Sequence, residues 1–314
     1  MTESNLSHRI VDLANSLGFD ACGMAEADFL KESSEHVEQW LSEGFEGDMT
    51  YLDRNKEKRY DPRLLVEGTQ TVVTVIYNYY PKTLLPADDN FKIAKYAYGN
   101  DYHEVLKQKL RELLEGIEAM TGKLAGTRVF VDSAPVLDRA WAVKCGLGFI
   151  GKNTTLIHPK KGSFFFIGHL FLPIKMEPFG KVIPNHCGRC TRCIDACPTG
   201  ALKAPFQIDA RRCLSYLTIE HKGPFEGIGE DLFHDWIYGC DICQDVCPYN
   251  RFARGNDEPL FQPSAELLAM RKEDWVNLDK PGFDALFRKS AVKRAGYEGL
   301  KRNIDFLAKK EASI

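Results

Sequence analysis

Eight of the ten cysteines in this sequence lie between residues 187 and 247: seven form two runs of regular spacing, and Cys213 lies alone between the runs. The first run is Cys187, Cys190, Cys193 and Cys197, the second is Cys240, Cys243 and Cys247, and a proline follows each run. A C-x₂-C-x₂-C-x₃-C-P run is typical of bacterial proteins with two iron–sulfur clusters, in which the fourth cysteine crosses to the other cluster. The spacing therefore predicts two [4Fe–4S] clusters.

The crossing rule assigns a cluster to every cysteine of this segment. The first cluster takes Cys187, Cys190, Cys193 and Cys247, and the second takes Cys197, Cys213, Cys240 and Cys243. Cys213 is placed there because the second run is one ligand short and no other cysteine of the segment is left. Two four-cysteine zinc sites are the alternative, although zinc requires neither the crossing nor the proline. We expect Cys22 and Cys145 to be buried structural thiols.

Length and composition indicate a cytoplasmic protein of two or three domains. The chain has 314 residues, 44% hydrophobic and 27% charged, which is more than one compact core usually holds. We expect no membrane segment, because the most apolar stretch, residues 164–174, is too short to cross a bilayer. The N-terminus lacks the pattern of a signal peptide. Ten cysteines in such a chain favour metal ligation in a reducing compartment over disulfides.

The charge is unevenly distributed. The net charge is −3, but residues 280–310 carry nine Lys or Arg against three acids, so this segment is +6 and the rest is −9. Such a segment is compatible with a polyanionic partner such as nucleic acid. A solvated helix face is the alternative.

The elements that must position these residues suggest an α+β fold in three parts. A buried strand is expected at 71–77, an amphipathic helix from Asp101, a short strand at 128–132 and a helix at 138–144. Residues 149–156 and 163–172 are predicted to be paired strands. The pattern after residue 248 is helical. We therefore expect an α/β domain at 1–180, a ferredoxin-like domain at 181–255 and a short C-terminal helical segment at 256–314.

Two polar residues at the ends of these elements are candidates for chemistry. Asp132 ends a strand, where it could cap the following turn or act as an acid. His103 lies in the first turn of a helix, and we expect it to be a surface or capping histidine.

At larger scale the sequence resembles the epoxyqueuosine reductases over nearly its whole length. The motifs that carry the resemblance are Tyr60-Asp-Pro62, Gly99-Asn-Asp-Tyr-His103, Val131-Asp-Ser-Ala-Pro135, Asp138-Arg-Ala140, Gly146–Asn153, Cys187–Gly200, Arg212–Tyr216 and Tyr238–Cys243. More distant relatives are the reductive dehalogenases. The resemblance implies cobalamin and two [4Fe–4S] clusters, and reduction of epoxyqueuosine to queuosine at the tRNA wobble position.

The resemblance also implies roles for single residues. Asp132 would be the proton donor, which requires its pKa to be raised by partial burial. Contacts to cobalamin or substrate would come from Arg59, Lys95, Asp132, Arg139, Lys152, Asn153, Ser215 and Asp241. The cobalamin would be base-off without a protein histidine ligand, since Asp101-Tyr-His103-Glu-Val-Leu106 lacks the glycine of the Asp-x-His-x-x-Gly motif.

The implied partners are a tRNA carrying epoxyqueuosine and a flavodoxin- or ferredoxin-type reductant, with the protein as a monomer. Longer members of the family carry several helical repeats, of which this sequence has about one, so we expect a reduced RNA surface in which residues 280–310 take part. Two alternatives stay open: a reductive dehalogenase-like enzyme acting on a small molecule, and an electron-transfer subunit.

Overall fold

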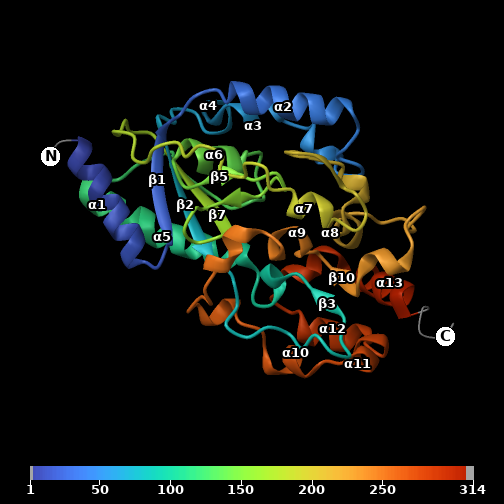
Figure 1. The fold of residues 1–314 in the computed structure, drawn as a ribbon. Coiled ribbons are helices and arrows are strands. Elements are labelled where there is room, and N and C mark those ends of the chain that lie inside the picture. Colours follow the sequence, from blue (N-terminus) through green and yellow to red (C-terminus); the bar gives the residue numbers. More distant parts are fainter. Residues whose placement is uncertain (1–2, 309–314) are drawn as a thin grey trace.

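The computed structural model describes residues 3–308, and its largest element is a four-stranded antiparallel sheet (Figure 1). The strands, in spatial order, are β1 (Ala21–Glu26), β2 (Thr71–Asn78), β7 (Phe165–Leu172) and β4 (Arg128–Phe130). In the register, Thr74 of β2 lies opposite Gly23 of β1 and His169 of β7. The strand predicted at 71–77 is confirmed, and so is a shorter one at 128–130.

Helices cover both faces of the sheet. On one face, α1 (Glu3–Ser16) and α5 (Tyr102–Thr121) contribute Ile10 and Leu110 to a core with Val73 of β2. On the other face, α6 (Asp138–Lys144) packs Trp141 against Val72. Because both faces are covered, the first seven residues of β2 are all buried, which explains an apolar run without polar alternation. The predicted helix at 138–144 is confirmed.

The predicted pairing of residues 149–156 with 163–172 is wrong. The short strand β5 (Phe149–Ile150) instead pairs with β6 (Leu156–Ile157) in a local hairpin. The long strand β7 pairs with β2 on one side and with β4 on the other. Its apolar residues are buried on both faces of the sheet, which no local hairpin could achieve.

Three further helices lie along one side of this sheet in Figure 1, namely α2 (Lys31–Ser42), α3 (Lys56–Tyr60) and α4 (Pro62–Leu65). Short 3₁₀ helices are η1 (Thr50–Leu52), η2 (Lys95–Ala97), η3 (Ala210–Arg212), η4 (Glu230–Phe233), η5 (Pro248–Phe252), η6 (Pro259–Phe261) and η7 (Ala291–Arg294).

The cysteine segment contains small elements only. These are α7 (Arg192–Asp195), the pair β8 (Leu202–Ala204) and β9 (Gln207–Ile208), α8 (Leu214–Ile219), β10 (Trp236–Tyr238) and α9 (Ile242–Asp245). β10 pairs in parallel with β3 (Lys92–Ile93), which precedes it by more than a hundred residues. Residues 91–98 therefore belong to the core of the second half of the chain, together with Tyr238 and Trp275.

The described residues after 248 form helices and no strand, as predicted. The α-helices are α10 (Ala265–Ala269), α11 (Lys272–Val276), α12 (Lys280–Leu286) and α13 (Gly296–Ala308). Asn303 ties α13 to the rest of the molecule, because its buried amide donates to the carbonyls of Thr218 at 2.9 Å and Ile237 at 2.8 Å. The last two basic residues of the 280–310 segment, Lys309 and Lys310, lie outside the described residues. No helix within residues 3–308 is long and apolar enough to span a membrane.

Candidate active site

Asp132 lies in the loop after β4, at the centre of a group of polar side chains. Its backbone has a φ of +54°, which is uncommon for a residue other than glycine. Its carboxylate accepts a short hydrogen bond from the Tyr102 hydroxyl and lies 3.6 Å from Nε2 of His103. The Asp132 side chain is 63% exposed, so water and ligands can reach the carboxylate. We call Asp132, Tyr102, His103, Arg139 and Arg59 the Asp132 cluster.

The start of α5 holds two members of this cluster. Asp101 caps the helix by accepting from the backbone N–H of His103, and its carboxylate also lies 2.7 Å from Nδ1 of the same histidine. The Tyr102 ring stacks on Phe166 of β7, with 4.3 Å between ring centroids. His103 is therefore held between two carboxylates, one at each ring nitrogen.

His103, expected to be a surface or capping histidine, does bond the capping Asp101, but its other ring nitrogen faces a second carboxylate that the sequence did not indicate. Its side chain is 25% exposed and faces Asp132. The sequence did contain a signal, because a histidine two residues after a helix-capping aspartate points back toward the cap. The partner that matters, Asp132, lies on a different element, 29 residues further along the chain.

The charges of this pair differ from the sequence-based expectation. Desolvation acts to raise the pKa of Asp132, but His103 at 3.6 Å, the hydrogen bond from Tyr102 and the charge of Arg139 outweigh it, so its pKa is lowered. The expected raised pKa is therefore wrong for the protein without ligands. Burial acts to lower the pKa of His103, but Asp101 and Asp132 raise it to about 9. At neutral pH the imidazole is charged and the Asp132 carboxylate is ionised.

The two arginines of the cluster differ in their bonding. Arg139, in α6, donates a short hydrogen bond to the Thr154 carbonyl. Burial lowers the pKa of Arg59, in α3, against the charges of Asp138 and Asp132. Within residues 3–308, Nε of Arg59 is buried without a hydrogen-bond partner. A buried donor without a partner is costly, so this atom is positioned to bind a ligand acceptor.

Asp138 extends the cluster into the sheet. Its carboxylate lies 3.1 Å from Nε2 of the buried His169, whose Nδ1 lies 3.0 Å from the Thr74 hydroxyl. The chain thus contains a second Asp–His pair, and the charge of its Asp138 acts on both Arg59 and Arg139. Sequence reasoning did not identify His169 or Asp138 as site residues.

The first four cysteines assigned by the crossing rule are neighbours. Burial raises the pKa of Cys193, and the thiols of Cys187 and Cys247 raise it further. Burial raises the pKa of Cys247 in the same way, with Cys187 and Cys190 adding to the effect. Cys247 therefore joins the first run although it is more than fifty residues away in sequence.

The other four cysteines form a second group. Burial raises the pKa of Cys240, and the thiols of Cys213 and Cys197 add to it. Burial, Cys213 and Cys240 likewise raise the pKa of Cys243. The neighbours include those that the crossing rule pairs and also Cys213, and their ligation stays a prediction. Cys22 and Cys145, expected to be structural, are buried.

Several residues expected to contact cobalamin bind the protein itself. Lys152 donates to the carbonyls of Gly188 at 2.7 Å and Cys190 at 3.0 Å. Asn153 donates to the Cys243 carbonyl at 3.3 Å. These two residues lie between β5 and β6 and thus attach this hairpin to both cysteine groups.

Lys95 and Asp241 form a buried ion pair. The Lys95 ammonium lies 3.4 Å from Asp241 and 2.7 Å from Asp245. Burial opposes the charge, but these carboxylates raise the pKa of Lys95. Ser215 is half-buried in the first turn of α8, two residues after Cys213. The structure therefore brings Arg59, Arg139 and Asp132 together and places the other predicted contacts beside the cysteines.

The basic segment at 280–308 is partly neutralised. Arg294 pairs with Glu220 at 2.8 Å, and Lys301 pairs with Asp305 at 3.0 Å. The Arg302 guanidinium donates to the carbonyls of Leu217 and His221. Because Glu220 lies outside the segment, its pair with Arg294 makes the local excess of positive charge smaller than the sequence count suggests.

Two family models match the chain. A model described as "4Fe-4S double cluster binding domain" matches residues 186–250, and one described as "Epoxyqueuosine reductase QueG, DUF1730" matches residues 59–133. The first match includes all eight cysteines and favours iron–sulfur clusters over zinc. The second includes Arg59, Tyr102, His103 and Asp132.

Full-length relatives carry the same name. An epoxyqueuosine reductase from Cellulophaga algicola is 48% identical over 306 residues, which are 98% of this chain and 99% of the relative. A crystal structure of an epoxyqueuosine reductase with an epoxyqueuosine-modified tRNA stem loop matches with a TM-score of 0.88 at 29% identity, covering 98% of this chain and 81% of that one.

A structure of the Bacillus subtilis enzyme, described as having its aspartate catalytic loop swung out of the active site, matches with a TM-score of 0.88 at 28% identity. It covers 99% of this chain and 84% of that one. These matches confirm the predicted α+β architecture with a ferredoxin-like segment and a short helical C-terminal part.

Proposed function

Because this chain belongs to the epoxyqueuosine reductases, a family of oxidoreductases, we propose that it reduces epoxyqueuosine to queuosine in tRNA, with Asp132 and His103 supplying a proton. The reaction consumes two electrons and two protons and converts an epoxide into an alkene and water. The observation that carries the proposal is the Asp132–His103 pair, in which a reachable carboxylate lies beside a charged imidazole. The catalytic aspartate loop named for the Bacillus subtilis relative supports the same assignment.

The cysteines of this chain fit two [4Fe–4S] clusters. Cys187, Cys190, Cys193 and Cys247 would hold one cluster, and Cys197, Cys213, Cys240 and Cys243 the other. Two groups of four neighbouring thiols provide the ligand number that each cluster requires. The hydrogen bonds from Lys152 and Asn153 would fix the loops that carry these ligands.

The Asp132 cluster fits a cobalamin. The unpartnered Nε of Arg59 offers a donor to a corrin amide or a phosphate, Arg139 would bind beside it, and Ser215 would contact the cofactor from the side of the cysteines. Both ring nitrogens of His103 face carboxylates, so neither is free to bind cobalt from below, which supports a base-off cofactor without a histidine ligand. When bound, cobalamin would supply a strongly reducing cobalt centre for the epoxide.

The protein residues can deliver the proton in two steps. Without ligands, the proton resides on His103 and Asp132 is ionised. When cofactor and substrate displace water, loss of solvation raises the pKa of the carboxylate. The proton then moves from Nε2 of His103 to Asp132, and from Asp132 to the epoxide oxygen. The Tyr102 hydroxyl holds the carboxylate in place during this transfer.

The three predicted segments would divide the work. Residues 1–180 would bind cobalamin, residues 181–255 would carry electrons, and residues 256–314 would add a tRNA contact. The substrate is a modified tRNA stem loop, as in the related structure. The protein would act in the cytoplasm as a monomer, with a flavodoxin- or ferredoxin-type protein as its electron donor.

The test uses anaerobic protein loaded with iron, sulfide and cobalamin, and an epoxyqueuosine stem loop with a chemical reductant. We expect about eight Fe and one Co per chain and conversion to queuosine by mass spectrometry. Asp132→Asn should keep both metals and slow conversion by about 10²- to 10⁴-fold. Asp257→Asn, which changes a carboxylate that is 93% exposed, is the matched control. Iron without cobalt, or normal turnover of Asp132→Asn, would contradict the proposal.

A further inference from the structure

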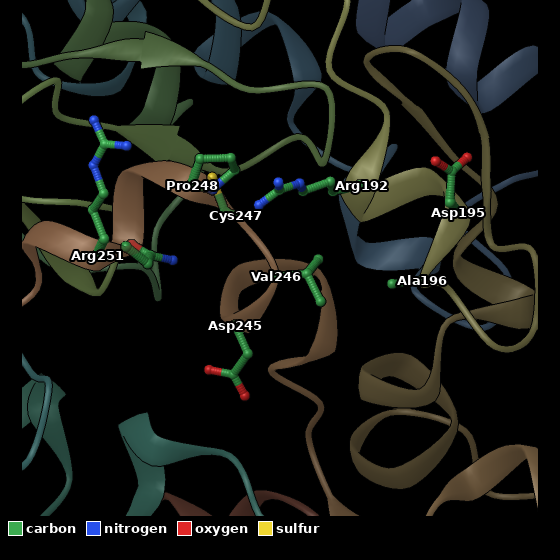
Figure 2. A pocket seen from close by; sticks show the side chains of 9 residues that line it. Arg192, Asp195, Ala196, Asp245, Val246, Cys247, Pro248 and Arg251 are labelled. Carbon is green, nitrogen blue, oxygen red and sulfur yellow. The ribbon is translucent and has the colours of Figure 1, made fainter.

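A hollow of about 850 Å³ lies over Cys247, among α7, α9 and η5 (Figure 2). It is distinct from the Asp132 cluster, because no member of that cluster lines it. Its lining combines charged and apolar side chains, namely Arg192, Asp195, Asp245, Val246, Pro248 and Arg251. Figure 2 shows Arg192 and Asp195 on one side and Asp245 and Arg251 on the other.

Within the described residues, one acid of the hollow forms an ion pair, whereas neither of its arginines does. Asp245 binds the Lys95 ammonium at 2.7 Å, and Asp195 accepts from the Thr191 hydroxyl at 2.7 Å. Among the residues the structure describes, neither Arg192 nor Arg251 forms an ion pair. Both are exposed, and a third exposed arginine, Arg189, lies within the first cysteine loop. The three exposed arginines therefore outnumber Asp195, the one lining acid for which the described residues supply no ion pair, so the rim carries a net positive charge on a chain whose net charge is −3.

The hollow adjoins the first cysteine group. Cys247 lines it directly, and Arg192 immediately precedes Cys193. Next to the lining residue Arg251 in sequence is Phe252, which is 39% exposed and lies under the Arg251 guanidinium at 4.6 Å from the ring centroid. Arginine and aromatic side chains around a small apolar centre are typical of protein–protein interfaces.

We propose that this hollow, rimmed by Arg189, Arg192 and Arg251, is where an acidic one-electron carrier protein docks to reduce the cluster held by Cys187, Cys190, Cys193 and Cys247. The inference rests on the proposed function and names the surface that its electron donor uses. Each docking event transfers one electron: the donor's reduced flavin or iron–sulfur centre loses it, the oxidised cluster gains it, and no bond or proton changes. Two such events supply one turnover.

The same arginines could instead contact RNA phosphate. The position of the hollow favours a redox protein, because its wall contains a predicted cluster ligand. The basic segment that we expect to contact tRNA is linked instead to the Asp132 cluster. Arg294 of this segment lies over the Tyr51 ring, and Tyr51 is close enough to Asp132 for the charge of that carboxylate to affect its pKa. An encounter of this kind is small and steered by charge, so its rate should fall with salt.

The experiment compares the double variant R192E/R251E with R111E/K175E, which changes net charge equally at two exposed residues away from the hollow. The probe is a flavodoxin of net negative charge. Its affinity in the oxidised form is measured by calorimetry, and the photoreduced form is used to follow cluster bleaching in stopped flow. At low salt we expect R192E/R251E to lower the second-order rate and the affinity by about tenfold or more. The control should match the unaltered protein, and high salt should remove the difference.

Three results would overturn the proposal. The double variant could keep the normal flavodoxin rate, it could lose reduction by methyl viologen to the same degree, or it could lose only stem-loop affinity, which would assign the face to RNA. If the double variant does not retain iron, Arg192→Gln and Arg251→Gln are tested singly by the same criteria. These measurements need no turnover, so they fail or succeed independently of the activity on epoxyqueuosine.

Discussion

His103→Gln is the substitution that most directly tests the proposed proton path. Glutamine keeps a hydrogen-bonding side chain between Asp101 and Asp132 but cannot hold a proton. If His103 stores the proton that Asp132 delivers, the variant should bind iron and cobalamin normally and should turn over slowly. General acid catalysis of this kind contributes about 10²- to 10⁴-fold in rate.

The structure also gives the pH at which the effect should appear. The pKa of His103 is raised from an ordinary 6.5 to about 9, which corresponds to roughly 3 kcal/mol in favour of the charged form. Because the folded-state pKa lies above the unfolded value, this stabilisation is fully present below pH 6.5. It is lost as the pH rises through about 9. The single-turnover rate of the unaltered enzyme should decline over the same range, because the imidazole proton is lost.

Asp101→Asn separates storage of the proton from its delivery. Asparagine still caps α5, but it removes the carboxylate 2.7 Å from Nδ1 of His103. The alkaline decline should then shift to lower pH, by roughly one unit or more, while turnover at pH 6 stays near normal. Asp132→Asn should instead lose turnover at every pH.

The assay is single-turnover conversion of the stem loop by prereduced protein between pH 6 and 10, with metal content measured for each variant. The proton path is refuted if His103→Gln keeps both the normal rate and a decline near pH 9. It is also refuted if Asp101→Asn leaves the position of that decline unchanged.

Three further outcomes follow from the structure. Cys213→Ser should lower the iron content from about eight to about four atoms per chain. The control Cys22→Ser should leave the iron content unchanged. Equal iron contents in the two variants would remove Cys213 from the ligand set. Lys152→Gln removes a positive charge bound to the first cysteine loop, so the midpoint potential of the cluster held by that loop should fall in an EPR-monitored titration. The control Lys160→Gln should leave the potential unchanged. An unaltered potential in Lys152→Gln would contradict this electrostatic role. Asn303→Ala leaves two buried carbonyls without a donor and should lower the free energy of unfolding by about 2–5 kcal/mol. The measurement is denaturant unfolding of the cofactor-free protein. A decrease below about 1 kcal/mol would show that these hydrogen bonds contribute little.

Local pattern was sufficient for much of the fold. β2 is an unbroken β-branched run because it is covered on both faces, and α6 begins and ends where its apolar spacing does. Pattern failed for β7, because an apolar strand of eight residues can pair locally or in the centre of a sheet. Only the packing of α1, α5 and α6 on that sheet decides between the two.

The sequence by itself predicted iron–sulfur chemistry, because the spacing within each cysteine run and the proline after it are typical of such proteins. It also indicated Asp132 through resemblance to a family. The tertiary structure alone decided the charge of that residue: the pKa of a carboxyl depends on what lies beside it, and His103 and Tyr102 reach it from another element. It also decided that Lys152 and Asn153 bind the cysteine loops and that two arginines remain unpaired over Cys247, since hydrogen bonds and ion pairs between distant segments depend on distances in three dimensions.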